Sequence, residues 1–200
     1  MFCYIIDVPR DAKALYDVAV EHDGVFTASE AREAGVSPHS LLQAERRGHV
    51  RRLSRGIYCL VNYPVSQERV QLWEAVLWPT LRRGPVAEVG VLSHLTALSL
   101  NYALLEYTPP KVSITIPPSL RVRRAKPAWL DVHVGEVPDR DVTSNIGGLP
   151  VTTLERTLFD CIAAHVDRRL VERVIDAAVD RETPDALDAE TVKRLRAALG

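Results

Sequence analysis

Gln43 and Arg46 are residues of the types that read base pairs in DNA. Glutamine can form two hydrogen bonds with adenine and arginine can do so with guanine, each pair giving about 1–3 kcal/mol of discrimination. On a helix, His39, Gln43 and Arg46 stand at i, i+4 and i+7, opposite Leu41 and Ala44, which can face a core. The pattern predicts a helix that enters the major groove, with DNA contacts from Ser37, His39, Ser40, Gln43, Arg46 and Arg47.

The basic residues continue beyond this helix. Residues 36–60 hold five arginines against one acid, Glu45. Three of the arginines fall in a segment with hairpin character, where they can contact phosphates or enter the minor groove; they are Arg51, Arg52 and Arg55. Charge runs are often only a solvated surface, but a run that spans a recognition helix and its neighbouring hairpin favours DNA binding.

A second basic stretch lies in the other half of the chain and consists of Arg121, Arg123, Arg124 and Lys126, with no acid between residues 111 and 130. It could extend a DNA surface or receive an acidic or RNA partner. Equally, basic residues at the edge of a sheet prevent strands from aggregating. The sequence leaves both readings open.

The elements that must position the first set of residues follow in order. Apolar spacing predicts a helix over 11–22, and Thr27 with Glu30 has the capping-box spacing that opens a second helix ending near residue 34. Ser37 and Pro38 are an N-cap and first-turn pair for the third helix. Residues 50–60 read as a two-stranded wing that turns at 54–56. We predict a winged helix-turn-helix domain over residues 1–63.

A linker at residues 62–65, marked by Pro64, predicts the boundary of a second domain over residues 66–200. Helices are expected at 66–81 and 92–100, then short strands between 111 and 151, including one near 121–124. Thr152 and Glu155 repeat the capping-box spacing before a further helix, and two more helices are expected at 168–179 and 188–199. The fold class is therefore α+β, with an N-terminal winged helix-turn-helix and a C-terminal mixed α/β domain.

Composition narrows the class of protein. The net charge is −1, so a nucleic-acid surface must come from local clustering of basic residues. The three cysteines, Cys3, Cys59 and Cys161, are far apart and form no CxxC pair, which argues against a disulfide framework or a zinc site. No export signal or membrane-length apolar run is present, so we expect a soluble cytoplasmic protein. We expect neither a metal nor a cofactor.

Signals of catalysis are weak, because the phosphate-loop, dinucleotide, serine-hydrolase and zincin motifs are all missing. Three groups remain that could be catalytic or metal-binding, each better explained as structural: Ser93 with His94, Asp131 with His133, and Asp160 with Cys161 and His165. A nuclease that holds magnesium through Glu155 and Asp160 is the least favoured alternative. We predict that the protein is not an enzyme.

The run GVFTASEAREAGVSPHSLLQAERRGHVRRLSRGIYCL, residues 24–60, resembles the N-terminal winged-helix domain of the AbiEi family of bacterial type IV antitoxins. LSHLTALSL and GGLPVTTLERTLFD, at 92–100 and 147–160, resemble the second domain of that family. The resemblance spans nearly the whole chain and loosens beyond Asp160.

The resemblance implies an antitoxin that also represses its own operon. Its N-terminal domain would bind inverted repeats in the promoter, and such a palindrome would take two copies of the chain. Its C-terminal domain would be needed to antagonise a neighbouring nucleotidyltransferase-like toxin. By motif position, the recognition role falls on His39, Ser40, Gln43, Arg46 and Arg47 and the wing role on Arg51, Arg52 and Arg55. The alternative is a protein-binding module that neutralises the toxin by direct contact.

Overall fold

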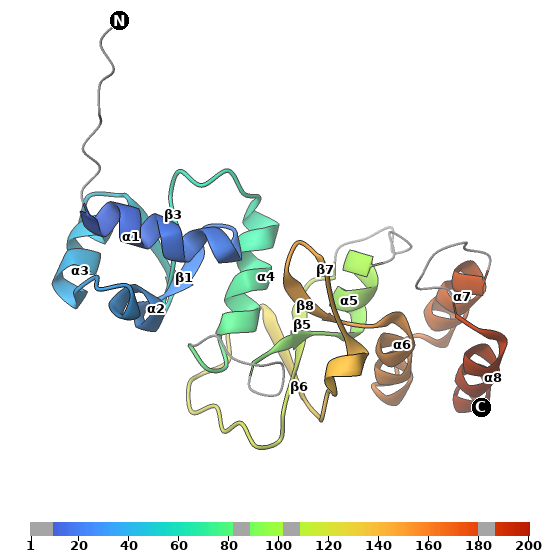
Figure 1. Ribbon diagram of the computed structural model, residues 1–200. Helices are drawn as coiled ribbons and strands as arrows, with labels where there is room; N and C mark the ends of the chain where they lie inside the picture. Colours follow the sequence, from blue (N-terminus) through green and yellow to red (C-terminus); the bar gives the residue numbers. More distant parts are fainter. Residues whose placement is uncertain (1–9, 82–88, 102–108, 180–186) are drawn as a thin grey trace, which may run out of the picture. The chain divides into compact units, whose positions relative to one another are not determined.

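The computed structural model describes residues 10–81, 89–101, 109–179 and 187–200 (Figure 1). The chain divides into two units, residues 1–83 and 84–200, each with helices and a sheet of its own. The fold is thus mixed α/β, as the sequence predicts. No helix in the described ranges is long and apolar enough to cross a membrane.

The first unit contains five helical segments and three strands within its described part. In chain order they are α1 (Arg10–Ala19), η1 (Val20–His22), β1 (Val25–Thr27), α2 (Ala28–Glu33), α3 (Pro38–Arg46), β2 (Val50–Ser54), β3 (Ile57–Leu60) and α4 (Gln67–Leu77). The strands form an antiparallel sheet in the order β1-β3-β2. The helix–turn–helix–hairpin order agrees with the prediction, while the short, wholly buried β1 was not predicted.

Local side-chain chemistry starts α2 and α3 where the sequence predicts. The capping box is present: the amide of Glu30 donates to Thr27 Oγ1 at 3.2 Å, and the amide of Thr27 donates to Glu30 Oε2 at 2.7 Å. Ser37 caps α3 by accepting from the amide of Ser40 at 3.0 Å, with Pro38 in the first turn. Such caps contribute about 1 kcal/mol each. They also fix where the exposed face of α3 begins.

The core of the first unit sets the orientation of α3. Leu41 is 6% exposed, and Ala44 packs against the same buried cluster. That cluster holds side chains from α1, α2, the turn after α2, α3 and the two edge strands β1 and β2: Leu15, Ala19, Phe26, Ala31, Val36, Leu41 and Val50. Since one side of α3 is buried in this cluster, its opposite side must face solvent.

The boundary between the units lies near residue 83 rather than at residues 62–66, so α4 belongs to the first unit. The physical reason is that residues just before β1 bind side chains of α4. Asp23, in a left-handed conformation with φ 50°, accepts hydrogen bonds from Arg69 and from Trp73 Nε1. The ring of Trp73 also packs on His22, with centroids 4.4 Å apart.

The second unit is built on a five-stranded mixed sheet in the order β6-β5-β4-β8-β7. Its described elements are β4 (Val91–Leu92), α5 (His94–Asn101), β5 (Val112–Ile116), β6 (Leu130–Val134), η3 (Asp139–Asp141), β7 (Val142–Ile146), β8 (Leu149–Thr152), α6 (Leu154–Ala163), α7 (Arg168–Val179) and α8 (Ala189–Ala198). Helices α5 to α8 share one buried cluster that includes Leu98, Leu158, Val174 and Leu195. The second unit therefore has a hydrophobic core of its own.

Two local predictions for this unit are wrong. No strand forms near residues 121–124, because β5 and β6 pair directly in parallel and residues 117–129 cross from the end of one to the start of the other. The predicted cap at Thr152 is also missing. Thr152 ends β8, its hydroxyl contacts Thr157 Oγ1 at 2.6 Å, and Thr153 becomes the N-cap of α6 without a side-chain cap bond.

Candidate nucleic-acid interface

The predicted base-reading face of α3 points to solvent. His39 and Arg46 are exposed and Gln43 is half-buried, as their spacing opposite Leu41 requires. The flanking positions Ser37 and Arg47 are exposed, and Ser40 is half-buried with its hydroxyl 3.0 Å from that of Ser37. The structure thus places the six predicted residues on or beside one accessible surface of a single helix.

The hairpin formed by β2 and β3 presents the other three predicted arginines. Arg51, Arg52 and Arg55 are all exposed. The pairing slips between Arg52 and Ser54, and the turn passes through Gly56 with φ 84°, a conformation that favours glycine. Arg51 donates to Gln67 Oε1 at 3.0 Å and Arg52 to the carbonyl of Ser54 at 3.3 Å, so both guanidinium groups are held near the hairpin surface.

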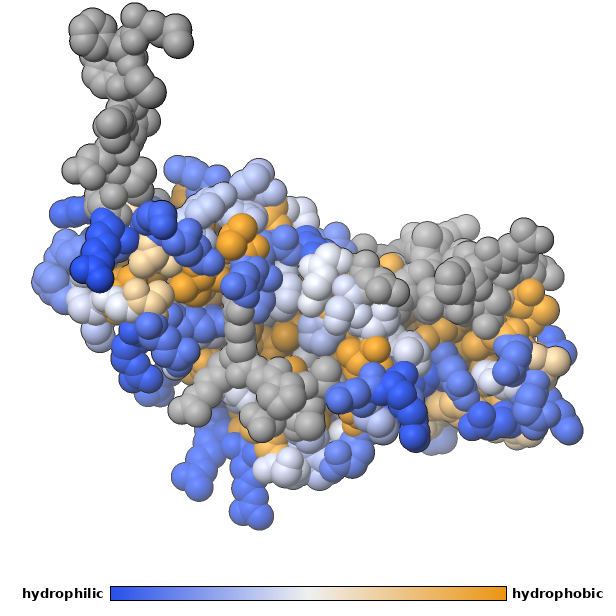
Figure 2. All heavy atoms as spheres, in the orientation of Figure 1, coloured by the Kyte–Doolittle hydropathy of each residue, from blue (hydrophilic) through white to orange (hydrophobic). Residues whose placement is uncertain are grey.

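The charges of the five predicted arginines are not neutralised by salt bridges within the described part of the chain. In the described ranges, no salt bridge joins Arg46, Arg47, Arg51, Arg52 or Arg55 to a carboxylate. Arg51 lies close enough to the buried Glu74, which is 8% exposed, to act on it electrostatically. Burial raises the pKa of Glu74, and the nearby Arg51 opposes this shift. On the face drawn in Figure 2, hydrophilic side chains cover most of the first unit, with small apolar patches between them.

A groove of about 470 Å³ lies between α2, α3 and the hairpin, beside the predicted contact residues. Its walls are largely apolar and include Pro38, Leu41, Leu42 and Tyr58, with Arg32 and Arg52 among the charged members. Leu42 is 42% exposed. Sequence reasoning missed Leu42, although its position three residues after His39 and four before Arg46 places it on the same face.

The second basic stretch lies on the irregular segment 117–129 of the other unit. Arg121 and Arg123 are exposed, Arg124 is half-buried, and Lys126 pairs with Asp131 at 3.4 Å. The segment is not a sheet edge in its own right, since β6 occupies that edge. Because the segment leads directly into the edge strand β6, the two readings of this basic stretch, as a binding surface or as protection of a sheet edge, both stay open.

Two of the pairs considered for catalysis come together in the second unit. Ser93 Oγ lies 2.9 Å from His94 Nδ1 and accepts from Thr115 Oγ1 at 2.8 Å. The ring of His94 stacks on that of His133, and His133 Nε2 lies 3.4 Å from Asp131 Oδ2. Burial and the neighbouring His133 lower the pKa of His94 to about 4. Ser93 is fully buried and His94 is 7% exposed, so these two residues belong to an internal polar network that reaches the surface at Asp131.

The third group, Asp160 with Cys161 and His165, does not form a site, because Cys161 and His165 do not share one surface. Cys161 is buried in the helical core, and burial raises its pKa to about 12, whereas His165 is exposed. A thiol of this kind is unreactive. Cys59 is also free and buried, and Cys3 lies outside the described residues.

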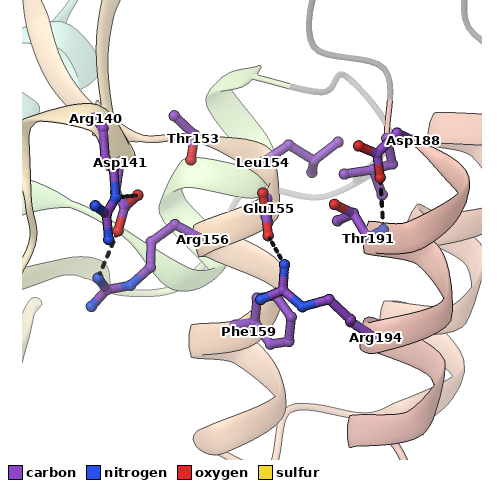
Figure 3. Close-up of a pocket in the computed structure, with 11 residues that line it drawn as sticks. Arg140, Asp141, Thr153, Leu154, Glu155, Arg156, Phe159, Asp188, Thr191 and Arg194 are labelled. Carbon is purple, nitrogen blue, oxygen red and sulfur yellow. Dashed lines mark hydrogen bonds and ion pairs between the residues drawn. The ribbon is translucent and has the colours of Figure 1, made fainter.

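Glu155 and Asp160, the residues of the nuclease alternative, are each paired with an arginine. Glu155 accepts from Arg194 at 2.9 Å in a pocket of about 650 Å³ between α6 and α8 (Figure 3). Asp160 accepts from Arg156 at 2.9 Å, and Arg156 also binds Asp141 at 3.2 Å. No group of three or more metal-ligating side chains occurs among the described residues. The geometry gives the nuclease alternative no support.

Comparisons with known proteins agree with the family resemblance. Residues 13–61 match the model of a family described as AbiEi antitoxin transcriptional regulators, which confirms the family resemblance over these residues. The crystal structure of the RV2827C protein from Mycobacterium tuberculosis has a similar fold, with a TM-score of 0.55 and 16% identity over 95% of this chain and 72% of that chain. No curated protein sequence matches the chain significantly.

Proposed function

We propose that this chain, which carries the signature of AbiEi antitoxin regulators in residues 13–61, is a winged helix-turn-helix repressor of its own toxin–antitoxin operon. The observation that carries the proposal is the accessible polar face of α3 beside a hairpin with three exposed arginines, none of the five arginines being paired with a carboxylate in the described ranges. A helix of this kind fits the major groove, and the hairpin can follow the adjacent phosphates.

The roles divide by side-chain chemistry. Gln43 and Arg46 would bond base edges, because both present two hydrogen-bonding groups at the solvent side of α3. His39, Ser40 and Arg47 would contact the bases or phosphates at the flanks, and Ser37 would reach the backbone from the start of the helix. Arg51, Arg52 and Arg55 would neutralise phosphates and thereby fix the register of the helix on the duplex.

The second unit, with its separate core in α5 to α8, would provide the antitoxin activity against a nucleotidyltransferase-like toxin. Inverted repeats in the promoter would place two chains on one operator, because each half-site takes one recognition helix.

A mobility-shift titration with the DNA upstream of the gene tests the DNA-binding role. We expect specific binding that weakens steeply with salt, and we expect Arg46→Ala to lose about 1–3 kcal/mol of preference for the correct base. Lys13→Ala is a matched control, since Lys13 is an exposed cation on α1 that pairs only locally with Asp17. Salt-independent binding, or equal losses in the two variants, would overturn the proposal.

Direct contact between the second unit and the toxin is the alternative route of neutralisation. A triple change of Arg51, Arg52 and Arg55 to Glu separates the two activities. If the toxin still co-purifies with this variant while DNA binding is lost, the second unit binds the toxin independently of the operator. If neutralisation disappears together with DNA binding, neutralisation acts through repression alone.

A further inference from the structure

Leu42 is an apolar side chain on a face that is otherwise polar. It is 42% exposed, whereas Leu41, one residue earlier, is 6% exposed and belongs to the core. At helical spacing Leu42 stands one turn from both His39 and Arg46. Any duplex that meets those two residues must therefore also meet Leu42.

Several of the residues that surround Leu42 are apolar as well, although Glu45 and Arg52 also line the groove. Leu42 lines the groove between α2, α3 and the hairpin together with Pro38 and Tyr58. Single exposed apolar residues are common on protein surfaces and need no special explanation. Leu42 differs because it joins an apolar groove wall to the face that carries His39, Gln43 and Arg46, so a small apolar group from a ligand could be covered on more than one side.

Major-groove chemistry identifies that group. Among the four bases only thymine presents a methyl group in the major groove, and apolar side chains are the residues that contact it. Gln43 and Arg46 provide hydrogen-bonding groups for adenine and guanine, whereas Leu42 can contribute nothing to such bonds. We propose that Leu42 determines specificity by packing against the C5 methyl of a thymine within each operator half-site, an inference that rests on the proposed DNA-binding function.

The test removes the methyl group and the side chain separately. The upstream duplex is first footprinted with the full-length protein, and each thymine in the protected half-site is then replaced in turn by deoxyuridine, which lacks only that methyl. We expect one replacement to weaken the binding of the wild-type protein to the duplex by about three- to tenfold, as the removal of one buried apolar carbon should. Leu42→Ala should bind the unmodified duplex more weakly and should be indifferent to the same replacement.

Two further variants keep the result interpretable. Leu42→Met retains an apolar side chain and should keep its sensitivity to deoxyuridine at that position. Arg46→Ala should bind more weakly and yet remain sensitive to deoxyuridine, because it leaves Leu42 in place. Circular dichroism of each variant shows whether α3 and its core are intact.

The outcomes separate this inference from the proposed function. If the wild type binds no upstream sequence specifically, both fail. If it binds specifically but no deoxyuridine replacement matters, or if Leu42→Ala loses the same factor as the wild type at the sensitive position, only the role of Leu42 is overturned.

Discussion

The imidazole rings of His94 and His133 lie face to face, with centroids 3.6 Å apart and planes inclined by 16°. His94 starts α5 with a positive φ of 52°, and His133 lies on β6 opposite Thr115 of β5. Arg156 adds to the positive potential and Asp131 opposes it. Two rings this close cannot both carry a proton without strong repulsion.

This stack predicts that the second unit loses stability in acid. The pKa of His94 is about 4 in the folded protein and about 6.5 in the unfolded chain, so the unfolded chain binds more protons between these values. Stability is therefore full above pH 6.5 and falls as the pH decreases toward 4, by about 1–2 kcal/mol at pH 5. Urea unfolding at pH 7.5 and at pH 5 measures the difference.

His94→Asn is the control for this pH effect, because asparagine tolerates a positive φ and does not titrate. Asp160 also has a pKa raised by burial, which acts in the opposite direction, and its contribution is the same in both proteins. The wild type should lose more stability than the variant between pH 7.5 and pH 5. Equal losses would show that folding does not lower the pKa of His94.

The hairpin arginines should govern the salt dependence of DNA binding. Each phosphate contact contributes about 0.9 to the slope of log K against log salt. Changing Arg51, Arg52 and Arg55 to alanine should therefore lower the slope by roughly 2–3 without altering the preferred sequence. Fluorescence anisotropy at several salt concentrations measures this slope. An unchanged slope would show that the phosphate contacts are made by residues other than Arg51, Arg52 and Arg55.

The second basic stretch gives a separate prediction. Arg121 and Arg123 are exposed on the segment 117–129 and have no salt bridge in the described part of the chain. If this segment contacts the DNA backbone, their change to alanine should lower the salt slope by about 2 and weaken binding to all sequences alike. We expect this result; binding indistinguishable from the wild type would show that Arg121 and Arg123 do not contact the DNA.

The capping box at the start of α2 should be important for the stability of the first unit. Thr27 is fully buried and Glu30 is 8% exposed. Thr27→Ala should destabilise the unit by about 1–2 kcal/mol, since it leaves a buried amide without its acceptor. Ser29→Ala, which removes only an exposed bond to Glu33, should cost far less. Thermal unfolding of the two variants makes the comparison, and equal decreases in their Tm would contradict the role of Thr27.

Local signals were sufficient to predict the helices that carry the site. The caps at Thr27 and Ser37 act within three residues of chain, so the sequence alone indicates where α2 and α3 begin. The exposed face of α3 follows from the burial of Leu41. The position of Leu42 could also have been found, because it stands three residues after His39 and four before Arg46, and the structure shows it 42% exposed.

Features that depend on distant partners could not be predicted. The strand β1 is three residues long and exists because Phe26 and its neighbours pair with β3. Leu120, Arg121, Val122 and Arg123 alternate apolar and basic side chains in a manner typical of a strand, but these residues pair with no strand and instead lie in the connection between β5 and β6. The contact between His94 and His133 likewise joins residues 39 positions apart, and it depends on the register of β5 and β6.

The attachment of α4 to Asp23 has a consequence for how this protein can be recombined. Any chimera that joins the first unit to a different second domain must carry the sequence through Leu81, because a fusion point at Tyr63 would remove Arg69 and Trp73 and leave the carboxylate of Asp23 without these two hydrogen bonds. The segment that can be transferred as a folded unit is therefore longer than the predicted winged-helix segment that it contains.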